Sequence, residues 1–186
     1  CFMAAMNDDA VKAIVLDVDS PGGEVAGMFD LADLIYAARG YKPVQAILTE
    51  CAYSAAYALA SAADSIIVPR TGGVGSIGVI AMLTDMSRAL DGAGVTVNII
   101  QYGARKADGN QASPLSDEAR EAFQAQVDTM GEMFVDTVAR NRGMAASKVK
   151  GTEAATYLGA AGVTIGLADA VMAPDAAFMA LLNQLS

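Results

Sequence analysis

The sequence predicts an α/β fold with a mostly parallel sheet and a helical C-terminal flank. Over residues 1–115, short apolar runs rich in β-branched side chains alternate with segments whose apolar residues recur at helical spacing. Strands that alternate with helices form βα units with right-handed crossovers, which produce a parallel sheet. From Asp117 to Arg142 the pattern changes to one long amphipathic helix, and shorter helical segments follow. The chain therefore divides into an α/β core at 1–115 and a helical flank at 116–186.

The core opens with its clearest strand and helix. Residues 11–18 read VKAIVLDV between two aspartates and a Ser-Pro-Gly-Gly turn, a composition typical of a buried strand. Residues 25–39 place apolar side chains at helical spacing and end at Gly40, a favourable C-cap. The same reasoning predicts, in chain order, a strand at 44–48, a helix at 54–63, strands at 66–68 and 77–83, a helix at 84–90 and a strand at 95–101.

The helical flank has a well-marked start. Ser116 is a preferred N-cap, and Asp117 and Glu118 place negative charge in the first turn, where the helix dipole favours it. Shorter helices are predicted at 145–150, 153–161 and 175–185. No linker, repeat or low-complexity tract interrupts the chain, so we expect one domain over residues 1–186. The chain lacks an initiator Met and enters a strand pattern almost at once, so we expect it to lack the first strand of its fold.

Composition excludes several kinds of site. The 186 residues contain no His, which rules out a Ser-His-Asp triad, a Cys-His dyad and His-ligated zinc within one chain. A net charge of −9 without a Lys/Arg cluster argues against a nucleic-acid groove. The two cysteines form no disulfide framework, which favours a reducing compartment. No segment approaches the roughly 18 apolar residues of a membrane-spanning helix. We expect no cofactor and no metal, since Asp17 and Asp19 have no third ligand at suitable spacing.

The first segment with candidate chemistry is the turn DSPGG at Asp19–Gly23, directly after the first strand. Its last four residues suit a type II turn, which can be purely structural. Gly22 and Gly23 also allow backbone N–H groups to approach a ligand at the carboxyl end of a strand, where an oxyanion hole can form. Both interpretations remain open at this point.

The second segment is ECAYSAAY at Glu50–Tyr57, a strand-to-helix corner. Ser54 is either an N-cap or a nucleophile whose oxyanion the amide of Ala55 stabilises. Cys51 has no histidine to pair with, so a buried, inert thiol is the favoured interpretation.

The third segment is GGVGSIG at Gly72–Gly78. It resembles a phosphate-binding loop only superficially, because no Lys-Ser/Thr follows and residues from Ile77 onward have a strand pattern. We interpret it as a glycine-rich bend that lets backbones pack closely.

The fourth segment is the polar loop YGARKADGN at Tyr102–Asn110. Lys106 is the only one of five lysines that follows a predicted strand inside a Gly-flanked loop. It is either a solvated surface lysine or a general base whose pKa is depressed by burial. Without histidine, such an amine is the natural base for a serine nucleophile.

Together these motifs resemble the signal peptide peptidase A family of Ser/Lys serine peptidases, in the ClpP/crotonase-like superfamily. The similarity runs through AIVLDVDSPGGEVAG, ECAYSAAYALASAADSIIVP, GGVGSIGV, GARKADGN and the late GLADAV. The run KADGNQASPLSDEAREAFQAQVDTMGEMFVDTVARNRG is most similar to the phage-type members, the lambda protein C group of capsid maturation proteases. The resemblance implies a spiral of ββα units around a mostly parallel sheet, and so a single Ser/Lys peptidase domain.

The resemblance also implies roles for individual residues. Ser54 matches the nucleophile and Lys106 the general base, while Ser76 matches a serine that orients that lysine. Gly22 and Gly23 match the glycines whose amides line the oxyanion hole. That Ser54 and Lys106 meet in space is implied by the resemblance alone.

We therefore expect a serine endopeptidase that acts on peptides or unfolded segments, such as capsid or scaffold proteins, during phage prohead maturation. A bacterial peptidase that degrades cleaved signal peptides is one alternative, and a non-catalytic capsid or scaffold-associated protein is another; an acyl-CoA enzyme is disfavoured. Family members form rings, so we expect a homo-oligomer whose serine and lysine come from one subunit or from neighbours. The expected location is the host cytoplasm or the procapsid, or a membrane if an anchor precedes the chain.

Overall fold

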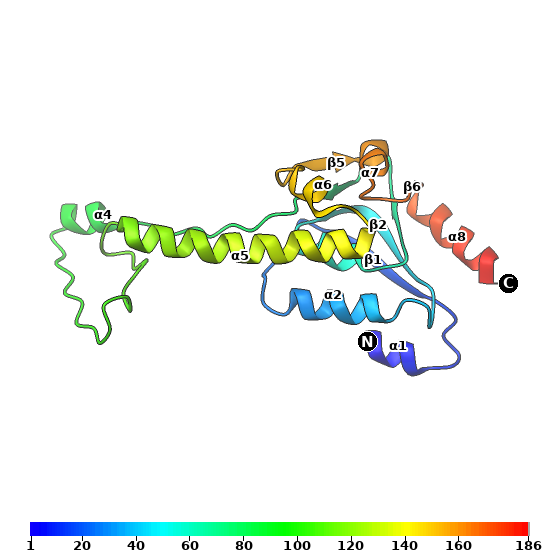
Figure 1. Cartoon of the computed structure of the whole chain (residues 1–186), viewed down its shortest axis with the longest axis horizontal. Helices are drawn as coiled ribbons and strands as arrows, with labels where there is room; N and C mark the ends of the chain where they lie inside the picture. Colours follow the sequence, from blue (N-terminus) through cyan, green and yellow to red (C-terminus); the bar gives the residue numbers. More distant parts are fainter. Residues whose placement is uncertain (186) are drawn as a thin grey trace. The chain divides into compact units, whose positions relative to one another are not determined.

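A computed structural model describes residues 1–185 of the chain (Figure 1). Its contacts divide it into two compact units, which we describe separately. The first unit joins Cys1–Gly78 to the segment that begins at Glu132, and the second is Val79–Gly131. The long helix α5, Asp117–Arg142, contributes residues to both units.

The first unit contains a six-stranded sheet. The order is β5-β4-β2-β3-β6, with β1 paired to β2. Every pairing is parallel except the antiparallel pair β4–β5. The strands are β1 (Ile14–Ser20), β2 (Val44–Tyr53), β3 (Ser65–Val68), β4 (Gly73–Gly75), β5 (Thr156–Leu158) and β6 (Ala170–Val171). The predicted fold class is confirmed: the chain is mixed α/β with a mostly parallel sheet and C-terminal helices.

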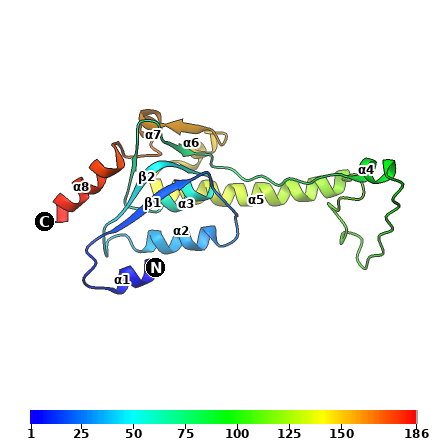
Figure 2. The same cartoon turned by 180° about the vertical axis from the view of Figure 1, so that it is seen from behind.

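Helices cover both faces of this sheet. Alternate residues of β2, such as Ala46 and Leu48, face a core that includes Phe134 and Val138 of α5. Ile47, between them, faces the other side and packs with Ile67 and with Ala177 of α8. Figure 2 shows α2 and α3 beside the strands in the first unit. The helices of the first unit are α1 (Phe2–Asn7), α2 (Met28–Ala37), α3 (Ala55–Ser61), α6 (Ala146–Lys150), α7 (Gly159–Ile165) and α8 (Pro174–Leu185).

The second unit holds α4 (Ser87–Gly92), the first part of α5 and long segments without regular structure. The strand predictions at 77–83 and 95–101 are wrong for the described chain. No backbone hydrogen bond joins residues 79–83 or 96–101 to another described segment. Their apolar side chains are exposed, as Ile80 at 93% and Ile100 at 99% show. β-branched residues favour strands only where a neighbouring strand and a packed face are available, and this chain supplies neither here.

The glycine-rich segment at 72–78 contains strand β4, where the sequence predicts only a bend. Its glycines allow close approach: a Cβ at Gly72 would lie 2.6 Å from Pro69 Cγ and overlap the carbonyl oxygen of Glu50. Small residues are therefore what permits β4 to pair with the carboxyl end of β2 at this point.

The predicted helix at 153–161 is also wrong. Glu153 and Ala154 have positive φ angles of 48° and 57°, β5 follows, and α7 begins only at Gly159. The short elements α1 and β6 were not predicted either, because such short segments carry too little periodicity. By contrast, α5 has the predicted bounds, and Ser116 caps it by accepting a hydrogen bond from the Ala119 amide at 3.1 Å.

Candidate active site

Ser54 lies at the corner between β2 and α3, in a strained backbone conformation. Its φ and ψ angles are 52° and −127°, which a non-glycine residue rarely adopts. Its amide donates a hydrogen bond of 2.9 Å to the Gly75 carbonyl, which holds the corner in place. Ser54 makes no side-chain cap, and its hydroxyl has no hydrogen-bond partner among residues 1–185. Ser54 therefore occupies the N-cap position of α3, where its carbonyl accepts a hydrogen bond of 3.1 Å from the Ala58 amide, but its hydroxyl does not cap the helix.

Gly22 packs directly against Ser54. A Cβ at Gly22 would lie 2.7 Å from the Ser54 Cβ and 3.2 Å from its Oγ, and Gly22 also has a φ of 122°. Only glycine meets both requirements without strain. Residues 21–24 form neither a hydrogen-bonded turn nor a bend, so the predicted type II turn is wrong for this segment. The Ser-Pro-Gly-Gly segment instead forms one wall of the Ser54 environment.

Three backbone amides near Ser54 differ in whether a hydrogen bond already occupies them. The Gly22 amide donates to the Ser20 Oγ at 3.2 Å, so it is already occupied. The Gly23 amide has no partner in the described chain, and a Cβ at Gly23 would have nothing within 4 Å. Ala55 is the first residue of α3, and first-turn amides have no partner within a helix. The amides of Gly23 and Ala55 are therefore unoccupied donors near Ser54 among the described residues.

Ser54 and Ser76 directly follow two neighbouring strands. β2 and β4 are parallel, with Tyr53 opposite Gly75, and each serine is the first residue after its strand. Ser76 also has a positive φ, 55°. The structure thus brings Ser54, Ser76 and Gly22 together within the first unit.

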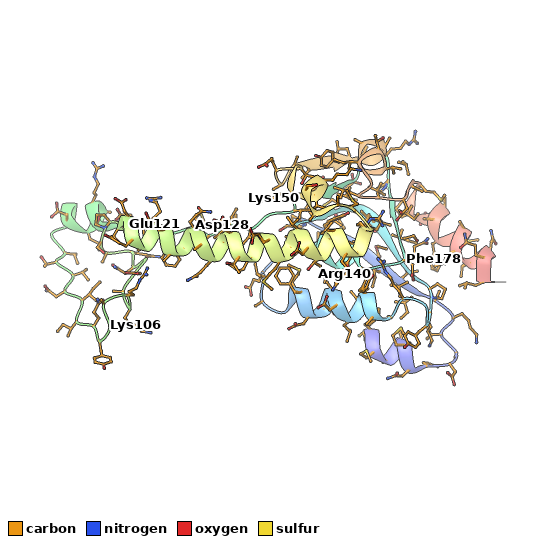
Figure 3. All side chains as sticks on the ribbon, viewed as in Figure 1. Lys106, Glu121, Asp128, Arg140, Lys150 and Phe178 are labelled. Carbon is orange, nitrogen blue, oxygen red and sulfur yellow. The ribbon has the colours of Figure 1, made fainter. Side chains whose placement is uncertain are left out.

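Lys106 belongs to the second unit, in an exposed turn where its amide donates to the Gly103 carbonyl at 3.1 Å (labelled in Figure 3). Its side-chain amine has no hydrogen bond or ion pair with any described residue. Next to it in sequence, Arg105 forms an ion pair of 2.9 Å with Asp108. The structure describes each unit by itself, so the pairing of Lys106 with Ser54 stays a prediction.

Cys51 is held as a protonated thiol. Partial burial, followed by a 3.5 Å hydrogen bond to the Asp19 carboxylate, raises the pKa of the thiol. Burial likewise raises the pKa of Tyr53. A thiol with a raised pKa has little thiolate at neutral pH, so Cys51 is a poor nucleophile and Ser54 is the better candidate. Among the described residues, no group of three or more His, Cys, Asp or Glu side chains could hold a metal ion.

Solved structures of other proteins share this fold. The fold matches that of a mutant of the 1510-N membrane-bound stomatin-specific protease with a TM-score of 0.59 and 14% identity, over 95% of this chain and 72% of that chain. It also matches a peptidase from Plasmodium falciparum with a TM-score of 0.51 and 11% identity, over 87% and 77%. The fold is therefore one that peptidases use.

The chain belongs to peptidase family S49, whose model matches residues 37–185. It is 44% identical over 169 residues to the head-tail preconnector protein GP5 of Enterobacteria phage P21, and 42% identical over 165 residues to capsid assembly protease C of Escherichia phage lambda. Those matches cover 91% and 89% of this chain but 34% and 38% of the relatives, so the chain spans about a third of their length. The chloroplastic serine protease SPPA of Arabidopsis thaliana is 28% identical, over 86% of this chain and 24% of that protein. The predicted family membership is confirmed.

One segment beside the candidate site was not found from the sequence. Residues 152–155 form a turn directly beside Ser76, where the Ala155 carbonyl accepts a hydrogen bond of 3.0 Å from the Ser76 amide. The segment reads Thr-Glu-Ala-Ala, which favours a helix, and no glycine or asparagine marks its positive φ angles. The sequence holds no local signal from which this turn could be predicted.

Proposed function

We propose that the chain is the catalytic domain of a serine endopeptidase that uses Ser54 as nucleophile and Lys106 as general base. The observation that carries the proposal is the strained Ser54 corner with its free hydroxyl, packed against Gly22. Strained serines with open hydroxyls are typical of nucleophiles on α/β folds. Membership of peptidase family S49 supplies the reaction class, hydrolysis of peptide bonds.

The proposed reaction begins when the neutral amine of Lys106 takes the proton of the Ser54 hydroxyl as Oγ attacks the peptide carbonyl carbon. The carbonyl π bond opens to an oxyanion, which accepts hydrogen bonds from the Gly23 and Ala55 amides. The C–N bond then breaks, and Lys106 returns the proton to the leaving amine. Water, deprotonated by Lys106, attacks the acyl-enzyme, and the Ser54 oxygen leaves with that proton. Ser76, next to Ser54, orients the lysine.

We propose that the working form is a homo-oligomer. The second unit carries Lys106 and also the two extended, apolar segments 79–83 and 96–101, whose backbone groups lack partners in the described chain. Exposed apolar strands without neighbours favour pairing with another chain. Whether one subunit or two supply Ser54 and Lys106 is decided by mixing Ser54→Ala with Lys106→Ala protein: shared sites regain part of the activity, whereas sites within one chain stay inactive.

We propose phage capsid maturation as the biological role, with capsid or scaffold segments as substrates in the procapsid within the host cytoplasm. Two relatives support this role, because they are named a capsid assembly protease and a head-tail preconnector protein. The SPPA relative supports the alternative role of signal peptide degradation. No helix among the described residues is long and apolar enough to cross a membrane. The name of the phage P21 relative also keeps a non-catalytic capsid role as an alternative.

The proposal is tested by peptide hydrolysis with Ser54→Ala. We expect hydrolysis to fall by about 10⁴-fold or more, because a removed nucleophile leaves only binding and oxyanion stabilisation. Ser147→Ala, at an exposed serine of α6, is the matched control and should keep full activity. Retained hydrolysis in Ser54→Ala would refute the nucleophile, and a wild-type chain that assembles without hydrolysing any peptide would favour the capsid alternative.

A further inference from the structure

We propose that the turn at residues 152–155 is a positioning element for Ser76, and through Ser76 for the proposed base. This inference rests on the proposed peptidase function and adds to it residues that never touch the substrate. It follows from three observations. Two residues of the turn have strained backbone conformations, a hydrogen bond ties the turn to α6, and the turn lies against the backbone at Ser76 and Gly78.

The strain lies at two consecutive residues. Glu153 and Ala154 have φ angles of 48° and 57°, and neither is Gly, Asn or Asp. Each such conformation is unfavourable for a residue that carries a Cβ. A backbone keeps two of them in succession only where the surrounding contacts determine the turn completely.

Those contacts begin at Thr152. Its side chain is 4% exposed, and its hydroxyl donates to the Val149 carbonyl at the end of α6 at 2.8 Å. Its own carbonyl accepts the Ala155 amide at 2.8 Å. The turn is therefore tied to α6 on one side and closed on itself.

The turn contacts Ser76 through a backbone hydrogen bond. The Ser76 amide donates to the Ala155 carbonyl at 3.0 Å, and the Gly78 amide donates to the Ser76 carbonyl at 3.0 Å. A Cβ at Gly78 would lie 2.8 Å from the Ala154 Cβ, and one at Gly75 would lie 2.5 Å from the Ala155 oxygen. Gly75 and Gly78 thus leave just enough room for the turn. A shift of the turn would therefore disturb the hydrogen bond that it accepts from the Ser76 amide and its close approach to Gly78.

Gly78→Ala tests this contact, because its new Cβ pushes against Ala154. We expect kcat to fall about ten-fold with KM nearly unchanged, since misplacing an active-site group by less than about 1 Å affects the chemical step more than binding. We also expect the pH profile of kcat to move, because Ser76 orients the base. Gly131→Ala, where nothing lies within 4 Å of the new Cβ, is the matched control and should leave both constants unchanged.

A second substitution that restores the activity of Gly78→Ala would distinguish a positioning role of the turn from a general loss of structure. Ala154→Gly removes the atom that Gly78→Ala collides with and suits the positive φ, so the double variant should return kcat to within about two-fold of wild type. Ala154→Gly alone should remain active and folded. Normal kcat in Gly78→Ala, or failure of Ala154→Gly to restore it in a folded protein, would overturn the proposal.

If Gly78→Ala does not fold, two variants at Thr152 test the positioning role of the turn instead. Thr152→Val removes the hydroxyl that anchors the turn, whereas Thr152→Ser keeps it. We expect kcat to fall about three-fold or more in Thr152→Val and to be unchanged in Thr152→Ser, with thermal unfolding measured on both. Equal kcat in the two variants would contradict a positioning role. Hydrolysis by wild type that Ser54→Ala abolishes, combined with no effect of Gly78→Ala, would refute this inference and leave the proposed function intact.

Discussion

The two units of the molecule fix their candidate catalytic residues in opposite ways. In the first unit, Ser54 is held by a backbone hydrogen bond, by contact with Gly22 and by strand pairing around it. In the second unit, Lys106 lies in an exposed turn, and its amine contacts no described partner. The candidate nucleophile is thus held in place by contacts within the first unit, whereas the proposed base has no such contacts among the described residues.

Removing the base should have the largest effect. We expect Lys106→Ala to lower kcat by about 10²–10⁴-fold without changing thermal unfolding of the first unit, because general base catalysis is lost and no packing is disturbed. Lys150→Ala, at an exposed lysine that Figure 3 also labels, is the control and should keep activity. Equal activity in the two variants would remove Lys106 from the mechanism.

The second largest effect on activity should come from disturbing the contact between Gly22 and Ser54. Gly22→Ala places a Cβ against Ser54 in a conformation with φ 122°, so we expect kcat to fall about 10²-fold. Gly40→Ala imposes a comparable backbone penalty at φ 84°, but nothing lies within 4 Å of its Cβ. Both variants should lose about 1 kcal/mol of unfolding free energy, and only Gly22→Ala should lose activity. Parallel loss of activity in both would show that backbone strain alone, not contact with Ser54, is responsible.

A charged residue in the extended segments 79–83 and 96–101 tests whether these segments pair with another chain. Ile80→Asp and Ile100→Asp alter side chains that are 93% and 99% exposed, so folding of the first unit should be unaffected. We expect both to reduce oligomer mass in sedimentation and to lower activity about ten-fold, because a buried charge disfavours strand pairing between chains. Tyr41→Asp, at a residue 81% exposed in the first unit, should do neither. Unchanged mass and activity in the isoleucine variants would place assembly elsewhere.

The smallest effect concerns stability of the first unit in acid. Burial opposes ionisation of Asp169, but hydrogen bonds from Arg142 and from the Ile66 amide outweigh it and hold its pKa below the ordinary value. The carboxylate therefore stabilises the fold at pH values above its unfolded pKa of about 3.9, and this contribution is lost as pH falls through the lowered pKa. Asp169→Asn should cost about 1 kcal/mol near pH 7 after solvent screening, with the difference from wild type shrinking below about pH 4. A difference that is constant with pH would contradict this assignment.

The fold was predictable wherever local pattern and tertiary environment agree. The apolar run at β1 is buried in the sheet, and the amphipathic pattern of α5 has its cap at Ser116, so both follow from the sequence. The segments at 77–83 and 95–101 have equally good strand patterns, but strand pairing needs a neighbouring strand, and residues 1–185 provide none for them. Pattern alone cannot report whether that neighbour exists.

The candidate site was predictable in its residues but not in its geometry. Ser54 and Gly22 stand at the ends of recognisable strands, so the sequence identifies them. The positive φ of Ser54 and the occupied amide of Gly22 depend on contacts that the local pattern does not encode. The turn at 152–155 has a helix-favouring sequence, and only its anchoring to α6 and to Ser76 imposes the strained conformation.

Covalent trapping tests the central claim most directly. The protein is incubated with a fluorophosphonate that phosphonylates activated serines, and the modified peptide is located by mass spectrometry. The account predicts one adduct per chain, on Ser54, formed far more slowly in Lys106→Ala and at a normal rate in Lys150→Ala. An adduct on another residue, or one on Ser54 whose rate does not depend on Lys106, would contradict it.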